Sequence, residues 1–209
     1  MTNILLIVFT ITLLYLAVAN RLMTYVNLLI LQGFILFGVA LIELTEMNVV
    51  NLILILLETV VVKAIAIPLF IRYVIIKNKI TREAEPFLPN FLSVIIVTII
   101  IIGVFIISHV IKDPNLHKIY FIAALSAIFC GMYLIATRRK IITHVICYVV
   151  LENGVFILSL AVGNEMPLLV NLGILLDVFV SVFLLGIFIN KVGDVTSDGD
   201  VSELSKLKD

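Results

Sequence analysis

The chain has 209 residues, of which 63% are hydrophobic and 13% are charged, and its mean hydropathy is +1.28. Soluble domains are about 45–50% apolar and about 25% charged, and a chain of this length has too little interior to hide so much apolar surface from water. The formal net charge is zero, so no overall field attracts a nucleic acid or another charged partner. This composition predicts a protein solvated by lipid and argues against a soluble enzyme, a disordered chain and a nucleic-acid-binding protein.

The sequence offers no ligand set for a cofactor. Its two cysteines, Cys130 and Cys147, both lie inside apolar runs and form no Cys-x-x-Cys pair. A disulfide framework, an iron–sulfur cluster or a zinc site needs more ligands, and the sequence contains neither a phosphate-binding glycine loop nor a dinucleotide fingerprint. We expect two inert thiols, no cofactor and no metal.

Seven apolar runs have the length of membrane-spanning helices, for which about 17–25 residues are typical. They are residues 3–19, 25–42, 49–71, 91–111, 119–137, 141–163 and 168–190. The runs are continuous rather than alternating, which favours helices over barrel strands. The first run is the shortest and ends in a sequence like a signal-peptide cleavage site, but no Lys or Arg precedes it, so we expect a retained helix. The predicted fold is an all-α, polytopic membrane helix bundle.

Basic residues predict the orientation of this bundle. Seven spans place the loops after spans one, three and five, and the C-terminus, on one side. That side carries Arg21, Arg72, Lys77, Lys79, Arg82, Arg138, Arg139, Lys140, Lys191, Lys206 and Lys208. The other side carries only Lys112 and Lys118. Positive residues favour the cytoplasm, so we expect a multi-pass protein of the cell inner membrane with its N-terminus outside and its C-terminus cytoplasmic.

The chain contains an approximate internal repeat. Gln32-Gly33 in span two recurs as Asn153-Gly154 in span six, and the stretch ending at Glu58 recurs as the stretch ending at Asp177, with offsets of 119 to 121 residues. Span four restores the starting side between the halves, so the repeats are parallel and related by an axis along the membrane normal. We divide the chain into an N-terminal three-helix repeat (1–76), a basic loop and linking helix (77–118), a C-terminal three-helix repeat (119–191) and a flexible cytoplasmic tail (192–209).

Four ionisable residues lie inside the predicted spans: Glu58, Lys63, Glu152 and Asp177. A charge at the bilayer centre costs at least about 2.5–3.5 kcal/mol, so such residues face the bundle interior and commonly mark ion or proton pathways. At about 1.5 Å per residue, Glu152 lies about 18 Å from Lys140, which is near mid-membrane. The alternative is a structural role in holding the helices together.

Lys63 is the candidate partner for one of these acids. In an α-helix it points about 140° away from Glu58, so we expect it to reach an acid on a neighbouring helix. Pro68 follows five residues later and removes a backbone donor, which predicts a kink in span three. A kinked helix beside a buried lysine is compatible with a water-lined path and equally with simple packing.

A polar stripe runs along span six. His144, Tyr148 and Glu152 are spaced four residues apart and share one face. Because His titrates near neutral pH, the stripe is a candidate proton relay from the cytoplasm to Glu152, although His144 could instead only anchor the helix at the headgroups. In span seven, small residues four positions either side of Asp177 favour close helix approach, which would pair Asp177 with Glu152.

The stretches Arg138-Arg139-Lys140, Glu152-Asn153-Gly154 and Gly173-Ile174-Leu175-Leu176-Asp177 resemble the membrane subunit called hydrogenase-4 component E. More distantly, they resemble subunit K of the proton-pumping NADH–quinone oxidoreductase and the C subunit of multisubunit cation/proton antiporters. The resemblance places Glu152 and Asp177 at the two buried acids of subunit K and covers about residues 119–191. It covers the N-terminal half loosely, where Leu31-Gln32 supplies no carboxylate.

The resemblance implies a non-catalytic subunit without a cofactor, placed between a redox-coupled module and antiporter-like subunits in a hydrogenase-like or complex-I-like assembly. Its buried acids would relay protons, and the proton-transfer candidates are Glu152, Asp177, Glu58, Lys63, His144 and Tyr148. Two alternatives remain: a subunit of a cation/proton antiporter without a redox partner, and a structural membrane scaffold.

Overall fold

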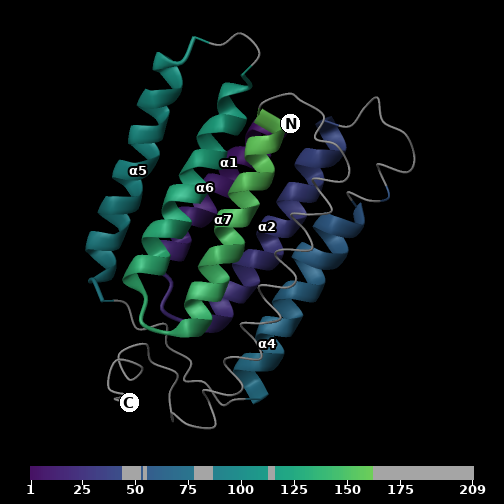
Figure 1. Ribbon diagram of the computed structural model, residues 1–209, viewed down its shortest axis with the longest axis vertical. Helices are drawn as coiled ribbons and strands as arrows, with labels where there is room; N and C mark the ends of the chain where they lie inside the picture. The colour runs from purple at the N-terminus through teal and green to yellow at the C-terminus, as the bar shows by residue number, and fades with distance from the viewer. Residues whose placement is uncertain (44–52, 54–55, 78–86, 113–115, 162–209) are drawn as a thin grey trace, which may run out of the picture.

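The computed structural model describes residues 1–43, 53, 56–77, 87–112 and 116–161. Over these residues the chain is built from helices (Figure 1). They are α1 (Thr2–Val18), α2 (Leu22–Glu43), the π-helix η1 (Leu57–Ala66), α4 (Ile67–Lys77), α5 (Asn90–Val110), α6 (Lys118–Thr137) and α7 (Ile141–Ala161).

The all-α bundle expected from the sequence is confirmed. Within the described residues, five helical segments are long and apolar enough to cross a membrane: 22–42, 59–77, 90–110, 118–137 and 141–161. α1 is equally apolar in character but has only 17 residues, as expected for the shortest run. The seventh predicted span, 168–190, lies outside the described residues, so the count of seven remains a prediction.

Four helices, α1, α2, α6 and α7, form the centre of the bundle (Figure 1). α5 packs against α1 and α6 at one edge, while η1 and α4 pack against α2 at the other. Along α1, every third or fourth residue is buried in the centre, namely Leu6, Phe9, Leu13 and Leu16. This spacing presents one face of the helix to its neighbours.

The connections after α1, α4 and α6 lie at the same end of the bundle. The Asn90 side chain at the start of α5 donates a hydrogen bond to the Asn20 side chain between α1 and α2 (2.9 Å), and the Phe87 N–H donates to the Thr137 carbonyl at the end of α6. At the opposite end, the His117 N–H donates to the Ala161 carbonyl. We call the first end, which carries Arg21, Lys77 and residues 138–140, the basic end.

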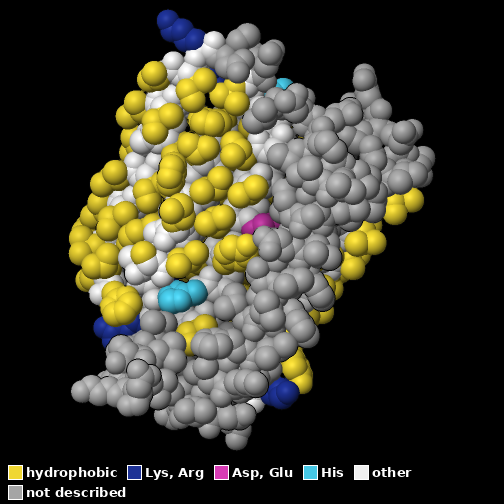
Figure 2. Space-filling model, viewed as in Figure 1, with side chains coloured by type: hydrophobic (Ala, Val, Ile, Leu, Met, Phe, Trp, Pro, Cys, Tyr) yellow, Lys and Arg dark blue, Asp and Glu magenta, His cyan; other side chains and the backbone are white. Residues whose placement is uncertain are grey.

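The outer surface has the character of a lipid-facing surface. Figure 2 shows hydrophobic side chains covering the face over α5 and α6, and the Lys and Arg side chains visible in this view lie toward the ends of the bundle. On α5, Phe91, Ile99, Phe105 and Val110 are all more than half exposed. Exposed apolar side chains on a helix of this length are expected where hydrocarbon takes the place of water.

Directly before Pro68, where the sequence predicts a kink, the chain forms the π-helix η1. Proline has no N–H and its ring collides with the carbonyl four residues earlier, and widening the preceding turn is one way in which helices relieve this conflict. Consistent with that account, the Ile67 N–H donates to the carbonyl of Val62, five residues earlier. The α-helical geometry assumed for residues 58–63 therefore does not apply, because residues five apart lie closer to one face in a π-helix.

A close approach between α2 and η1 holds this π-helix against the centre. A Cβ atom added at Gly33 would lie 2.7 Å from the Cα of Ala64, which is inside van der Waals contact with backbone. Only glycine fits at this point. The contact fixes the depth of Lys63, the residue before Ala64, relative to Gln32, the residue before Gly33.

We predict that Gly33→Ala lowers the free energy of unfolding by about 1–3 kcal/mol, because the added methyl group forces α2 and η1 apart. The measurement is reversible unfolding of the purified chain in detergent. Gly103→Ala is the matched control, since no atom lies within 4 Å of a Cβ built there. Equal stability of the two variants would contradict the packing role of Gly33.

Candidate functional site

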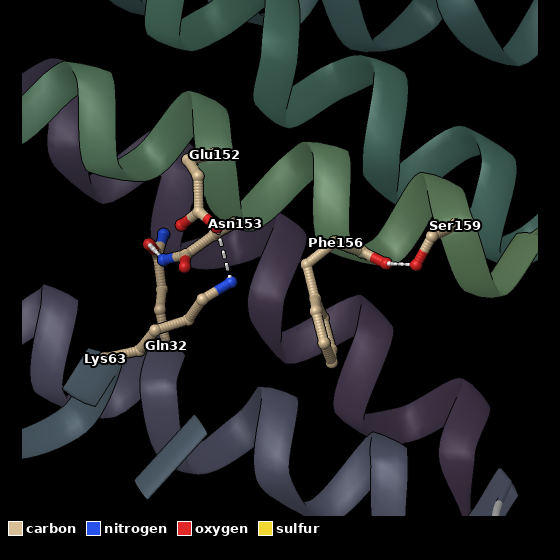
Figure 3. A network of polar contacts seen from close by, with 6 residues as sticks. All are labelled: Gln32, Lys63, Glu152, Asn153, Phe156 and Ser159. Atoms are coloured by element: carbon tan, nitrogen blue, oxygen red, sulfur yellow. Dashed lines mark hydrogen bonds and ion pairs between the residues drawn. The ribbon is translucent and has the colours of Figure 1, made fainter. Parts of the chain in front are cut away.

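A buried ion pair lies inside the bundle. Lys63 Nζ on η1 is 2.8 Å from Glu152 Oε1 on α7, and the two side chains are only 2% and 5% exposed. Figure 3 shows both side chains directed toward each other across the space between their helices. At this separation the two groups form a direct ion pair. Lys63 thus meets an acid on a neighbouring helix, as the sequence predicted.

A chain of uncharged polar side chains lies next to this pair. Asn153 Nδ2 donates to Gln32 Oε1 (3.2 Å), and Gln32 Nε2 donates to Thr12 Oγ1 (2.9 Å). Thr12 in turn donates to the Phe9 carbonyl of its own helix (2.6 Å). All three side chains are buried. This amide network of Asn153, Gln32 and Thr12 therefore joins α7, α2 and α1. Figure 3 shows its Asn153 and Gln32 side chains close to the ion pair.

Two glycines allow the helices to bring these groups together. Gly33 lets η1 approach α2 beside Gln32, as described above. Gly154 performs the same task between α7 and α6, because a Cβ there would lie 2.9 Å from the Ala124 carbonyl oxygen and from Ala127 Cβ. Each close contact is adjacent in sequence to an amide side chain of the network, so the local packing sets the positions of the polar groups.

Lys63 also lies beside an aromatic ring. Its ammonium lies 4.5 Å from the centre of the Phe156 ring, a cation–π geometry whose strength increases where water is excluded. Among the side chains that the structure describes, Glu152 is the sole carboxylate. Its Oε2 atom and Asn153 Oδ1 accept no hydrogen bond from the described residues, which leaves acceptor positions for a proton or water.

Only one of the three residues in the polar stripe of α7 is fully buried. Glu152 is buried, whereas His144 and Tyr148 are half-buried. The His144 Nε2 atom lies 2.7 Å from the Arg138 carbonyl oxygen, so its imidazole ties the start of α7 to the connection from α6. This contact favours the anchoring interpretation of His144 and leaves the proposed relay through Tyr148 a prediction.

Two of the predicted acids are outside this description. Asp177 lies outside the described residues. The backbone of Glu58 is part of η1, but its side chain is outside the described part of the structure. Their expected roles therefore remain predictions, and so does a pairing between Asp177 and Glu152.

Residues 138–140 form the connection between α6 and α7, as the sequence predicts. The sequence did not indicate that Arg138 and Lys140 are buried, each only 1% exposed. The Arg138 guanidinium donates to the carbonyls of Leu16 and Ala17 at the end of α1. The last carbonyls of a helix lack partners in their own helix and accept hydrogen bonds from a nearby cation.

The sequence reasoning missed the hydrogen-bonding role of Gln32 and Thr12. The candidate residues were ionisable groups, and Gln32 entered only as the repeat counterpart of Asn153 and as a position without a carboxylate. The available signal was the rarity of a long amide side chain in the middle of an apolar helix, because such a group needs a buried partner.

We predict that Lys63→Met lowers the free energy of unfolding by about 3–5 kcal/mol, since it leaves the Glu152 carboxylate buried without its cation. The Lys63→Met, Glu152→Leu double variant should be more stable than Lys63→Met alone, because it removes the uncompensated charge. Unfolding in detergent is measured for the wild type, Lys63→Met, Glu152→Leu and the double variant. Additive losses in the double variant would show that the two residues do not act as a pair.

Comparison with known proteins places the site in a family context. Residues 119–209 match the family described as NADH-ubiquinone/plastoquinone oxidoreductase chain 4L. The matched segment includes α6 and α7, and hence Glu152 and Asn153, but it is less than half of the chain. This match supports the complex-I-like subunit group, while the finer resemblance to hydrogenase-4 component E rests on the sequence motifs alone.

One relative extends over most of the chain. It is an uncharacterized protein of Mycobacterium tuberculosis, Rv0085, which is 25% identical over 187 residues, covering 88% of this chain and 85% of the relative. No solved structure matches the chain. Together with the five apolar helices, the family match supports a multi-pass membrane protein associated with an oxidoreductase complex.

Proposed function

We propose that the chain is a non-catalytic membrane subunit of an ion-translocating oxidoreductase complex, in which the Lys63–Glu152 pair takes part in proton transfer. The observation that carries this proposal is the 2.8 Å contact between two ionisable groups that are almost fully buried. Intramembrane charges are costly and are typically found at ion and proton pathways. The family match of the segment that contains Glu152 supplies the class of complex.

The pair has the chemistry that a coupling element needs. Charged together, Lys63 and Glu152 are neutral overall, and in a low-dielectric interior that is their favoured state. A proton that arrives at Glu152 leaves a net positive charge on Lys63, and a proton that leaves Lys63 gives a net negative charge. Either state is costly unless a neighbouring charge responds. A change of protonation at this site therefore favours a compensating change of charge in adjacent helices or subunits.

The amide network suits the transmission of such a change. When Glu152 releases Lys63, the neighbouring Asn153 and Gln32 side chains can each exchange donor and acceptor roles by rotating their amides. The network reaches α1 through Thr12. A rearrangement of its hydrogen bonds would therefore extend across the centre of the bundle. In this account Asp177 and Glu58 extend the proton path, and His144 and Tyr148 connect it to the basic end.

The remaining assignments follow from the sequence. We propose that the basic end faces the cytoplasm of a cell whose inner membrane holds the complex. The partners would be other membrane subunits, including antiporter-like ones, with the redox centres in a nickel–iron hydrogenase or related oxidoreductase on other chains. A second candidate is a cation/proton antiporter subunit, which would use the same acids without a redox partner.

We predict that Glu152→Gln assembles into the complex but lowers coupled proton or sodium transport at least about tenfold, because glutamine keeps the side-chain volume and cannot carry the proton. Transport is measured in inverted membrane vesicles while an electron donor drives the complex. Ser159→Ala is the control on the same helix, since Ser159 bonds only the Phe156 carbonyl of its own helix.

Three results separate the candidates. Wild-type transport per assembled Glu152→Gln complex would contradict the proton-transfer role, and loss of assembly with normal transport per complex would support the scaffold. Transport driven by an ion gradient but independent of any electron donor would support the antiporter. Copurification in mild detergent identifies whether hydrogenase or antiporter subunits accompany the chain.

A further inference from the structure

The hydrogen bonds of the amide network run in one direction. At the end of the network on α1, Thr12 Oγ1 lies 2.6 Å from the Phe9 carbonyl oxygen. A carbonyl oxygen can only accept, so the single hydroxyl proton of Thr12 is used in this contact. The Thr12 oxygen is then the acceptor of the bond from Gln32 Nε2 (2.9 Å). The Thr12 hydroxyl therefore fixes the orientation of the Gln32 amide.

The orientation of Gln32 in turn fixes that of Asn153. Because Nε2 of Gln32 is turned to Thr12, its Oε1 atom faces α7 and accepts from Asn153 Nδ2 (3.2 Å). The oxygen of the Asn153 amide is directed away from Gln32 and accepts no hydrogen bond from the described residues. Figure 3 shows this side chain close to the ion pair. The network thus leaves an acceptor oxygen beside Lys63 and Glu152.

An acceptor oxygen at this place favours one of the two charged states of the pair. The state is net positive when a proton arrives at Glu152 first, and net negative when a proton leaves Lys63 first. A carbonyl oxygen carries partial negative charge and can accept from an ammonium or from a protonated carboxyl, so it stabilises the net positive state. A buried dipole that is already oriented acts without further reorganisation.

We propose that Thr12 is a positioning residue that, through Gln32 and Asn153, makes the ion pair take up a proton at Glu152 before it releases one from Lys63. The inference rests on the proposed function and adds the order of its two steps. The Glu152 carboxylate first binds a proton, and the Lys63 ammonium then loses one. Transfer of the carboxyl proton to the neutral amine restores the ion pair, so one proton enters and one leaves in each cycle.

Few other groups near Glu152 change charge at neutral and mildly acidic pH. Lys63 is the charged group in direct contact with it. The other described titratable side chains that are buried on α7, on the connection before it and on the helices packed against it keep one charge state in this range; they are Tyr25, Tyr120, Cys130, Arg138, Lys140 and Cys147. On the half-buried side of α7, Tyr148 is also a phenol, whereas His144 titrates. His144 is the same in all variants compared below, so differences between them do not come from it.

The test is donor-driven proton transport by the assembled complex in inverted membrane vesicles, measured against the pH of the medium. Thr12→Val keeps the branched shape and removes the hydroxyl, so that the Asn153 amide is free to turn its N–H groups to the carboxylate. We expect transport per complex at neutral pH to fall about tenfold, which corresponds to the loss of a hydrogen bond to a charged group. Transport should recover in a medium about one pH unit more acidic, because a higher proton concentration compensates for weaker uptake by mass action.

Two control variants separate the hydroxyl from the packing of α1. Thr12→Ser retains the hydroxyl and should restore the wild-type pH profile. Thr10→Val makes the same substitution two residues earlier, where the hydroxyl bonds only the Leu6 carbonyl of its own helix, and should also give the wild-type profile.

Several results would overturn the proposal. Recovery of Thr12→Val in alkaline rather than acidic medium would show that release comes first. A wild-type profile in Thr12→Val, an equal loss at every pH, or the same loss in Thr12→Ser would remove the positioning role. If Thr12→Val does not assemble, Gln32→Met breaks the same chain of hydrogen bonds and should show the loss that acid relieves. A wild-type or pH-independent profile in Gln32→Met would then overturn the proposal.

Failure of this inference is distinguishable from failure of the proposed function. If Glu152→Gln lowers transport while Thr12→Val retains the wild-type profile, the order of steps and the role of Thr12 are wrong, and the proton-transfer role of Glu152 stands. Wild-type transport in the Glu152→Gln complex would contradict the proposed function itself.

Discussion

The cost of placing ionised side chains in hydrocarbon is the constraint on which the rest of this structure depends. Lys63 and Glu152 reduce that cost by pairing at a distance of 2.8 Å between Nζ and Oε1. The attraction within a buried pair offsets the loss of hydration only when the geometry of the pair is good. The glycine contact of α2 with η1, the glycine contact of α6 with α7 and the amide network all contribute to that geometry. The fold thus holds two opposite charges in direct contact in its interior, so that they offset each other.

The same constraint applies to the two buried cations whose contacts the structure describes in detail. In the middle of the bundle, Lys63 is paired with the carboxylate of Glu152. At the basic end, the Arg138 guanidinium instead contacts the backbone carbonyls of Leu16 and Ala17 and lies near the Tyr25 ring. A buried carboxylate and the free carbonyls at a helix end are thus two ways of compensating a buried positive charge.

The all-α bundle could be predicted from the sequence, and so could a contact of Lys63 with an acid on a neighbouring helix, although not that this acid is Glu152. A run of about 20 apolar residues has few alternatives in a membrane, and a buried lysine requires an acid on a neighbouring helix. The burial of Arg138 and the π-helix before Pro68 could not be predicted in this way. The burial of Arg138 depends on α1 ending beside the connection from α6. The π-helix is one of several backbone changes that can relieve the clash between a proline ring and the preceding turn. The role of Gln32 required knowing that α2 and α7 are neighbours.

The most direct test of the central claim is an infrared difference spectrum of the assembled complex, recorded between its resting and electron-driven states. If Glu152 gains and loses a proton during turnover, the spectrum contains a carboxylic acid C=O band that is absent from the Glu152→Gln complex and shifted in the Lys63→Arg complex. If the carboxyl region of the spectrum is the same for the wild type and Glu152→Gln, Glu152 keeps one protonation state throughout and the proton-transfer account is contradicted.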